Sequence, residues 1–175
     1  MALEYRLTLA GAVAMGEVAA RALPDPADQL TPTPSGQVLS ADLDERYGFS
    51  VDVVADDHGY YSAPTETGDW EWEPDTAVDL TFEMTREADR FAEALRHAIT
   101  AIARVLASGP EDAALMLSGD LLLLTRVDGV ITKYRPTWWA HYPWANEIIP
   151  GWGQGGVLPG PVGGLGECRV MVGGG

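Results

Sequence analysis

The stretch TAVDLTFEMT, Thr76 to Thr85, decides the fold of this chain. Apolar and polar residues alternate along it, and a period of two is typical of a β-strand with one buried face. The alternation puts Val78, Leu80, Phe82 and Met84 on the core face and Asp79, Thr81 and Glu83 on the other. The sequence therefore predicts a half-buried strand whose carboxylates point away from the core.

A long amphipathic helix is predicted directly after this strand, from Glu87 to Ala107. Its apolar residues recur at helical spacing: Phe91, Ala94, Leu95, Ala98, Ile99, Ile102, Val105 and Leu106. We expect Thr85 to cap the start of the helix, and Gly109 with Pro110 to end it.

Further strands flank these two elements. EYRLTLAG (residues 4–11) alternates like a strand, and a short helix is expected from Met15 to Leu23. YGFSVDVVADDHGYY (residues 47–61) predicts a strand, a turn and a return strand that begins at Tyr60. After the long helix, residues 113–134 predict a three-stranded meander, with the apolar run Leu121 to Leu124 covered on both faces.

The predicted fold class is α+β, a mostly antiparallel sheet of about six to eight short strands with one long and one short helix packed on it. At 175 residues the chain suits one domain, which we place at residues 1–149. Residues 150–175 are rich in Gly and Pro, and we expect a flexible C-terminal tail there. Between them lies an irregular aromatic segment, which either folds over the sheet as a lid or forms a contact surface (Tyr134, Trp138, Trp139, Tyr142, Trp144 and Trp152).

Negative charge is concentrated in one part of the chain. The formal net charge is −15, from 26 acidic and 11 basic residues. Residues 42–83 contain thirteen acids and one base, Arg46, so this segment alone carries −12. We expect such a chain to be repelled by nucleic acid and by anionic membranes and to attract basic proteins. Acidic composition without a particular partner is the alternative explanation.

Other chemistry has little support in the sequence. The acids around Trp70 and Trp72 in DWEWE (residues 69–73) leave open a small hydrolase or carbohydrate-active protein, because paired carboxylates beside aromatic rings are typical of such sites. We expect no catalytic residue, no metal and no cofactor, since the histidines are scattered and GWGQGG (residues 151–156) follows no strand. The N-terminus lacks the pattern of a signal peptide, so we expect a cytoplasmic protein.

A docking surface for a basic partner is therefore the preferred interpretation, with a plain adaptor domain as another alternative. The candidate partner-binding residues are Asp52, Asp56, Asp57, Asp69, Trp70, Glu71, Trp72, Glu73, Asp79 and Glu83. An incoming cationic surface would relieve the mutual repulsion of these carboxylates and would be steered toward them. Oligomeric state leaves no signal in the sequence.

Three stretches together resemble a known family: ALEYRLTLAG (residues 2–11), AVDLTFEMT (residues 77–85) and LMLSGDLLLL (residues 115–124). They resemble the immunity family of the swarming-inhibition toxin system, over roughly residues 2 to 147. The resemblance implies a small cytoplasmic protein that binds and neutralises a cognate polymorphic toxin. It brings no catalytic residue with it, and the Gly-rich tail lies outside it.

Overall fold

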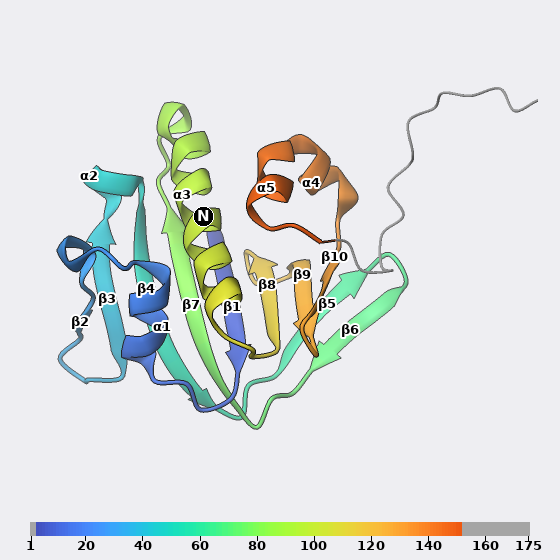
Figure 1. The fold of residues 1–175 in the computed structure, drawn as a ribbon, viewed down its shortest axis with the longest axis horizontal. Helices are drawn as coiled ribbons and strands as arrows, with labels where there is room; N and C mark the ends of the chain where they lie inside the picture. The colour runs from blue at the N-terminus through green and yellow to red at the C-terminus, as the bar shows by residue number, and fades with distance from the viewer. Residues whose placement is uncertain (1–2, 152–175) are drawn as a thin grey trace, which may run out of the picture.

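The computed structural model describes residues 3–151, and its main body is an eight-stranded sheet (Figure 1). The strands are β1 (Glu4–Ala10), β2 (Thr31–Pro32), β3 (Val38–Leu43), β4 (Phe49–Asp57), β7 (Thr76–Met84), β8 (Ala113–Leu117), β9 (Leu121–Val127) and β10 (Val130–Lys133). Their order is β10-β9-β8-β1-β7-β4-β3-β2, and neighbouring strands are antiparallel. The predicted α+β class with a mostly antiparallel sheet is confirmed.

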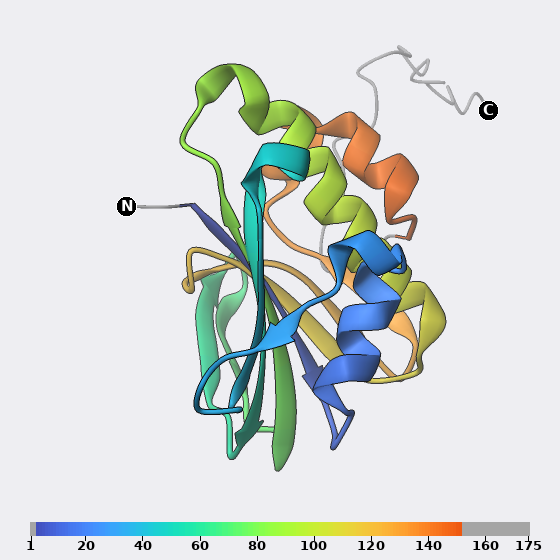
Figure 2. The same ribbon diagram turned by 90° about the vertical axis from the view of Figure 1, so that its left-hand side faces the viewer.

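The helices lie on one face of this sheet (Figure 2). They are α1 (Met15–Ala22), α2 (Asp44–Tyr47), the long α3 (Ala88–Ser108), α4 (Pro136–His141) and α5 (Pro143–Ile148). A short 3₁₀ turn, Pro26–Asp28, follows α1. The long and the short predicted helices are therefore present, together with three further short helices.

The main core fills the space between the sheet and α1 and α3. Leu7, Leu80 and Val53 are aligned across β1, β7 and β4, and all three are fully buried. Ile99 and Ile102 of α3 belong to the same buried cluster. Burying each such side chain stabilises the fold by about 1.5 to 3 kcal/mol. This burial determines which face of each strand is turned toward the core.

The N-terminus of α3 differs from the prediction. The capping position is Glu87 instead of Thr85, and no side chain caps it. The Thr85 hydroxyl accepts a hydrogen bond from the Glu87 backbone N–H at 3.3 Å, which is a turn just ahead of the helix.

Two arginines satisfy carbonyl groups at the C-terminal end of α3. Arg21 donates to the Val105 carbonyl at 2.7 Å, and Arg126 donates to that of Leu106. Both guanidinium groups also face Glu111, at 2.9 Å from Arg21 and 3.6 Å from Arg126. Positive charge at this end of a helix is favourable because the last carbonyls carry partial negative charge.

The return strand predicted to begin at Tyr60 is present, but it pairs with a different strand from the one predicted. β5 (Tyr61–Thr65) does not pair with β4; it pairs with β6 (Gly68–Trp72) in a separate hairpin. This hairpin packs on the sheet face opposite to the helices (Figure 2), where Tyr61 and Ala63 meet Ala77, Ala114, Met116 and Leu122 in a second, smaller core. The predicted burial of the Leu121–Leu124 run on both faces is confirmed for Leu122, Leu123 and Leu124, whereas Leu121 is 37% exposed.

The aromatic segment is more ordered than predicted, because α4 and α5 replace the expected irregular chain. Pro136 and Pro143 occupy the first turns of these helices, where a missing N–H costs nothing. The predicted C-terminal tail lies, from residue 152 onward, outside the described residues.

Candidate functional site

One half of the sheet face opposite to the helices is covered by the β5–β6 hairpin, and the other half is not. We call the second half the open face. Its residues come from β1, β3, β4 and β7: Glu4, Ser40, Asp42, Ser50, Asp52, Thr81 and Glu83. All of them are exposed or partly exposed, in contrast to their apolar neighbours along each strand.

Strand register places Glu4, Glu83 and Asp42 in one row across the open face, and Asp52 in the adjoining row that begins at Arg6. Glu4 of β1 lies directly opposite Glu83 of β7, and Glu83 lies opposite Ser50, which in turn faces Asp42. In the adjoining row, Asp52 faces Thr81. Like charges directly opposite each other destabilise a sheet, so this arrangement has a cost that burial does not offset.

The acids of the hairpin point away from the sheet. Asp69, Glu71 and Glu73 are exposed, and Glu71 accepts a hydrogen bond from the Tyr60 hydroxyl at 2.9 Å. Trp70 and Trp72 alternate with them and pack as a tilted pair against the second core. The two tryptophans thus hold the acidic strand β6 on the sheet.

Asp56 and Asp57, at the end of β4, are exposed as well. By strand parity Asp56 lies on the same face as Asp52, whereas Asp57 lies on the face of Val51 and Val53, toward the helices. Eight of the ten predicted partner-binding residues are therefore on the side of the molecule opposite to α1 and α3: Asp52, Asp56, Asp69, Trp70, Glu71, Trp72, Glu73 and Glu83. Two acids that the prediction did not single out, Glu4 and Asp42, join them. The alternation of β1 and β3 is the signal that could have placed both on this face.

Asp79 lies on the predicted face of β7, away from the main core, and it is partly exposed. The hairpin packs beside it, and Thr8 and Tyr61 both donate hydrogen bonds to its carboxylate. Burial raises the pKa of the Asp79 carboxyl, while the hydrogen bond from Thr8 and the positive charge of Arg6 act in the opposite direction. Asp79 therefore supports the hairpin and is a poor candidate for direct contact with a partner.

The aromatic segment contributes mainly to the interior. Trp139 is fully buried, and its indole N–H donates to the Tyr134 carbonyl at 2.9 Å. Trp138, Tyr142 and Trp144 are partly buried and pack against the main core. Trp139 thus acts as the predicted lid, and Trp152 lies outside the described residues.

The sequence also raised a hydrolase, and two acids near Trp72 do line a pocket. Glu73 and Asp75 border a hollow of about 260 Å³ together with His58. Both carboxylates are exposed, however, whereas an acid–base pair needs two different environments that favour opposite protonation states. The rings of Trp70 and Trp72 do not border this pocket, so the combination of acids and aromatic platforms is not formed there.

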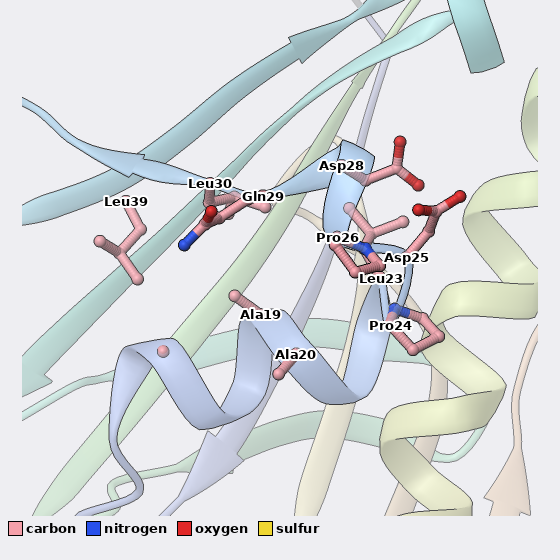
Figure 3. A pocket seen from close by; sticks show the side chains of 11 residues that line it. Ala19, Ala20, Leu23, Pro24, Asp25, Pro26, Asp28, Gln29, Leu30 and Leu39 are labelled. Atoms are coloured by element: carbon pink, nitrogen blue, oxygen red, sulfur yellow. The ribbon is translucent and has the colours of Figure 1, made fainter.

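Another pocket lies between α1 and β3, with a volume of about 330 Å³ (Figure 3). Its wall is largely apolar, with Ala19, Leu30 and Leu39 facing one another. Figure 3 shows the carboxylates of Asp25 and Asp28 turned away from these side chains, and both pair with Arg46. An apolar slot with neutralised acids at its end offers no group for acid–base chemistry.

Residues 3–151 contain neither a metal-binding cluster nor a helix that could span a membrane. No group of three or more His, Cys, Asp or Glu side chains converges there as a metal site would require. None of the helices in this part of the chain has the length and apolar character needed to cross a bilayer.

The fold and the site define an α+β protein with helices on one side of its sheet and an acidic surface on the other. A family model described as SitI3-like matches residues 3–143, and the chain belongs to this family. Membership is consistent with the class of Sit-type immunity proteins. No curated protein and no solved structure matches the chain.

Proposed function

We propose that this chain is an immunity protein that neutralises a cognate toxin by docking onto it, without catalysis. The family supports the class, and the acidic side of the molecule supports the mode of action. The observation that carries the proposal is the row of open-face acids in which Glu4 and Glu83 face each other. A surface with no partner has no need of this repulsion, whereas a basic partner converts it into attraction.

The proposed contact surface consists of the open face and the outer side of the hairpin. Its central residues are Asp52 and Glu83, and its outer ones are the exposed acids at the end of β4, on β6 and just after β6 (Asp56, Asp69, Glu71 and Glu73), with Asp57 at the border. Trp70 and Trp72 keep β6 in place, and their half-exposed rings supply apolar area at the edge of the contact.

The partner is a basic protein, such as a toxin that uses a positive surface to grip its own target. Nucleic acid and anionic membranes are disfavoured by the net charge of −15. The cytoplasm is the proposed location, since a toxin must be met where it acts.

The test is co-purification with candidate toxin domains from neighbouring genes, first at low and then at high salt. We expect a complex at about 50 mM salt that weakens toward 500 mM, because the Debye length, roughly 10 Å at 0.1 M, shortens as salt rises and screens the attraction between exposed charges. Absence of a complex at every salt concentration would refute the proposal.

The hydrolase alternative is separated by a variant. The double substitution Glu73→Gln with Asp75→Asn removes the two carboxylates of the pocket beside His58. If protection is non-catalytic, a cell that carries this variant in excess over the toxin still survives. Loss of protection with an unchanged affinity for the toxin would instead support catalysis.

A further inference from the structure

A pocket on the helix side of the sheet has a character unlike the rest of this acidic protein. It lies between α4 and the turn that joins β8 to β9, and its volume is about 510 Å³. Its lining includes the apolar side chains of Leu121 and Leu123 and the aromatic rings of Trp138 and Tyr142. Cavities of roughly 300 to 1,000 Å³ with apolar walls and a few polar groups are typical of small-molecule sites.

The charge of this pocket is opposite to that of the chain. Arg135 and His141 lie in its lining, which contains no Asp or Glu. Four further pockets in residues 3–151 each have two acidic side chains in their lining. A pocket with a cationic group and no acid, in a chain of net charge −15, favours an anionic occupant.

Arg135 is held in an unusual backbone conformation. Its φ is 55° and its ψ is 64°, in the left-handed region, and Pro136 follows it. This region costs about 1 to 2 kcal/mol for a residue with a side chain. Three hydrogen bonds hold it there: its N–H donates to Glu66 at 3.1 Å, its Nη2 donates to the Pro64 carbonyl at 2.6 Å, and its carbonyl accepts from the Trp138 N–H at 2.9 Å.

These bonds leave most of the guanidinium group without a partner. Of its five N–H donors, one is used by Pro64, and no ion pair within 4 Å involves Arg135 among residues 3–151. Its Nε is buried without a hydrogen bond. The hairpin thus positions a cation whose hydrogen-bonding capacity is incomplete at the rim of an apolar pocket, and strain of this kind often accompanies a binding role.

We propose that this pocket binds a small molecule with one carboxylate and an aromatic or branched aliphatic body. The body lies on Leu121 and Leu123 beside the rings of Trp138 and Tyr142. The carboxylate accepts hydrogen bonds from the Arg135 terminal nitrogens, with His141 near the rim. The apolar part of the site, at Leu123 and Trp138, is on the other side of the sheet from the open face, and the hairpin that holds Arg135 is the element that the two proposed sites share.

The probe is 3-phenylpropionate, titrated into the ¹⁵N-labelled full chain and followed by NMR. We expect saturable shifts of the indole N–H of Trp138 and of the backbone of Leu121. The neutral 3-phenylpropionamide keeps the apolar body and loses the charge, so it should bind about tenfold more weakly, as a charge-assisted hydrogen bond predicts. Equal binding of acid and amide, or no saturable shift with the acid, would overturn the proposal.

A pair of variants on β9 gives the matched control. Leu121 is 37% exposed at the pocket, and Val127 is 53% exposed at the other end of the same strand. Leu121→Glu adds an acid to the pocket and should abolish binding of 3-phenylpropionate, whereas Val127→Glu adds the same charge elsewhere and should leave it unchanged. Both positions are exposed, so the thermal midpoints of both variants verify that the fold is intact. Binding that survives Leu121→Glu would contradict the assignment of the site.

Discussion

Glu4 and Glu83 lie directly opposite each other on the antiparallel strands β1 and β7, on the face that no helix covers. A purely structural surface gains nothing from this pair, because like charges at opposed positions repel. In the proposed complex the same two carboxylates meet a positive surface. The pair is therefore the clearest place to separate what stabilises this fold from what the protein does.

Glu83→Gln should have opposite effects on stability and on binding. Removing one charge of the pair should raise the free energy of unfolding by about 0.2 to 1 kcal/mol, the usual size of a cross-strand pair effect. The same change should slow association with the toxin. Chemical unfolding and stopped-flow mixing measure the two quantities. A variant that is destabilised, and yet associates as fast as the wild type, would contradict both expectations.

Asp79 should behave differently from Glu83, because the hairpin covers it. Asp79→Lys removes the acceptor of the hydrogen bonds from Thr8 and Tyr61 and should cost about 1 to 3 kcal/mol, the usual penalty for buried donors without partners. Glu83→Lys, at an exposed position on the same strand, is the control and should not lower the free energy of unfolding, because a lysine opposite Glu4 replaces a repulsive pair with an attractive one. Equal free energies of unfolding for the two lysine variants would show that the hairpin does not protect Asp79.

Asp79→Asn tests the pH dependence of the same site. Burial raises the pKa of the folded carboxyl, so its contribution favours folding below the unfolded pKa of roughly 3.9 and is lost as pH rises through the folded pKa. The asparagine variant keeps an acceptor oxygen without the charge. It should be more stable than the wild type at pH 7, and the difference should shrink toward pH 4 in urea titrations. A difference that grows on acidification would show that the shift has the opposite sign.

Glu111 should contribute stability at neutral pH. The hydrogen bond from Arg21 lowers the pKa of Glu111, so its contribution is present above the unfolded pKa of roughly 4.3 and is lost as pH falls through the folded pKa. Glu111→Gln should lower the free energy of unfolding at pH 7 by about 1.5 to 3 kcal/mol, the size of a hydrogen bond to a charged group. Thermal unfolding should show the loss disappearing on acidification. A constant loss at every pH would mean that the charge is irrelevant.

Lys133 provides a test at high pH. Burial lowers its pKa from 10.5 to about 8, and its ammonium group donates to the Asn146 side chain at 2.9 Å. A depressed pKa makes the folded state gain stability as pH rises from about 8 toward 10.5. The difference in the free energy of unfolding between the wild type and Lys133→Met should therefore shift in favour of the wild type over that range. This difference should not change between pH 6 and 7. If it also stays constant up to pH 10, the ammonium group of Lys133 is not buried as described.

Much of the fold could be predicted because one period dominates each element. The alternation in β7 placed Leu80 and Phe82 in the core, and the helical spacing around Ile99 placed α3 on top of them. Neither pattern reports which other segment covers a strand on its second face. Ala77 and Ala114, small residues at outward positions, were the signal that something packs there, and the partner was the β5–β6 hairpin.

The same limit explains the part of the site that sequence reasoning missed. Asp79 and Glu83 have the same parity on β7 and cannot be told apart by alternation, yet the first is under the hairpin and the second is exposed. Trp70 and Trp72 stand out as candidate anchors by residue type, whereas their packing on the second core depends on contacts far apart in sequence. That Glu4 lies opposite Glu83 depends on the register between β1 and β7, and the register is known only once the two strands are paired in the structure.

The central claim is that a basic partner is attracted to one side of this molecule, and two triple variants of equal charge test it most directly. Asp42→Asn, Asp52→Asn and Glu83→Gln remove three of the four acidic charges of the open face and leave Glu4. Glu17→Gln, Asp89→Asn and Glu93→Gln remove the same charge from exposed positions on α1 and α3. The measurement is the association rate constant with the toxin domain at low salt. The first variant should associate at least about tenfold more slowly than the second, as electrostatic steering predicts. Equal rates for the two variants would contradict the account.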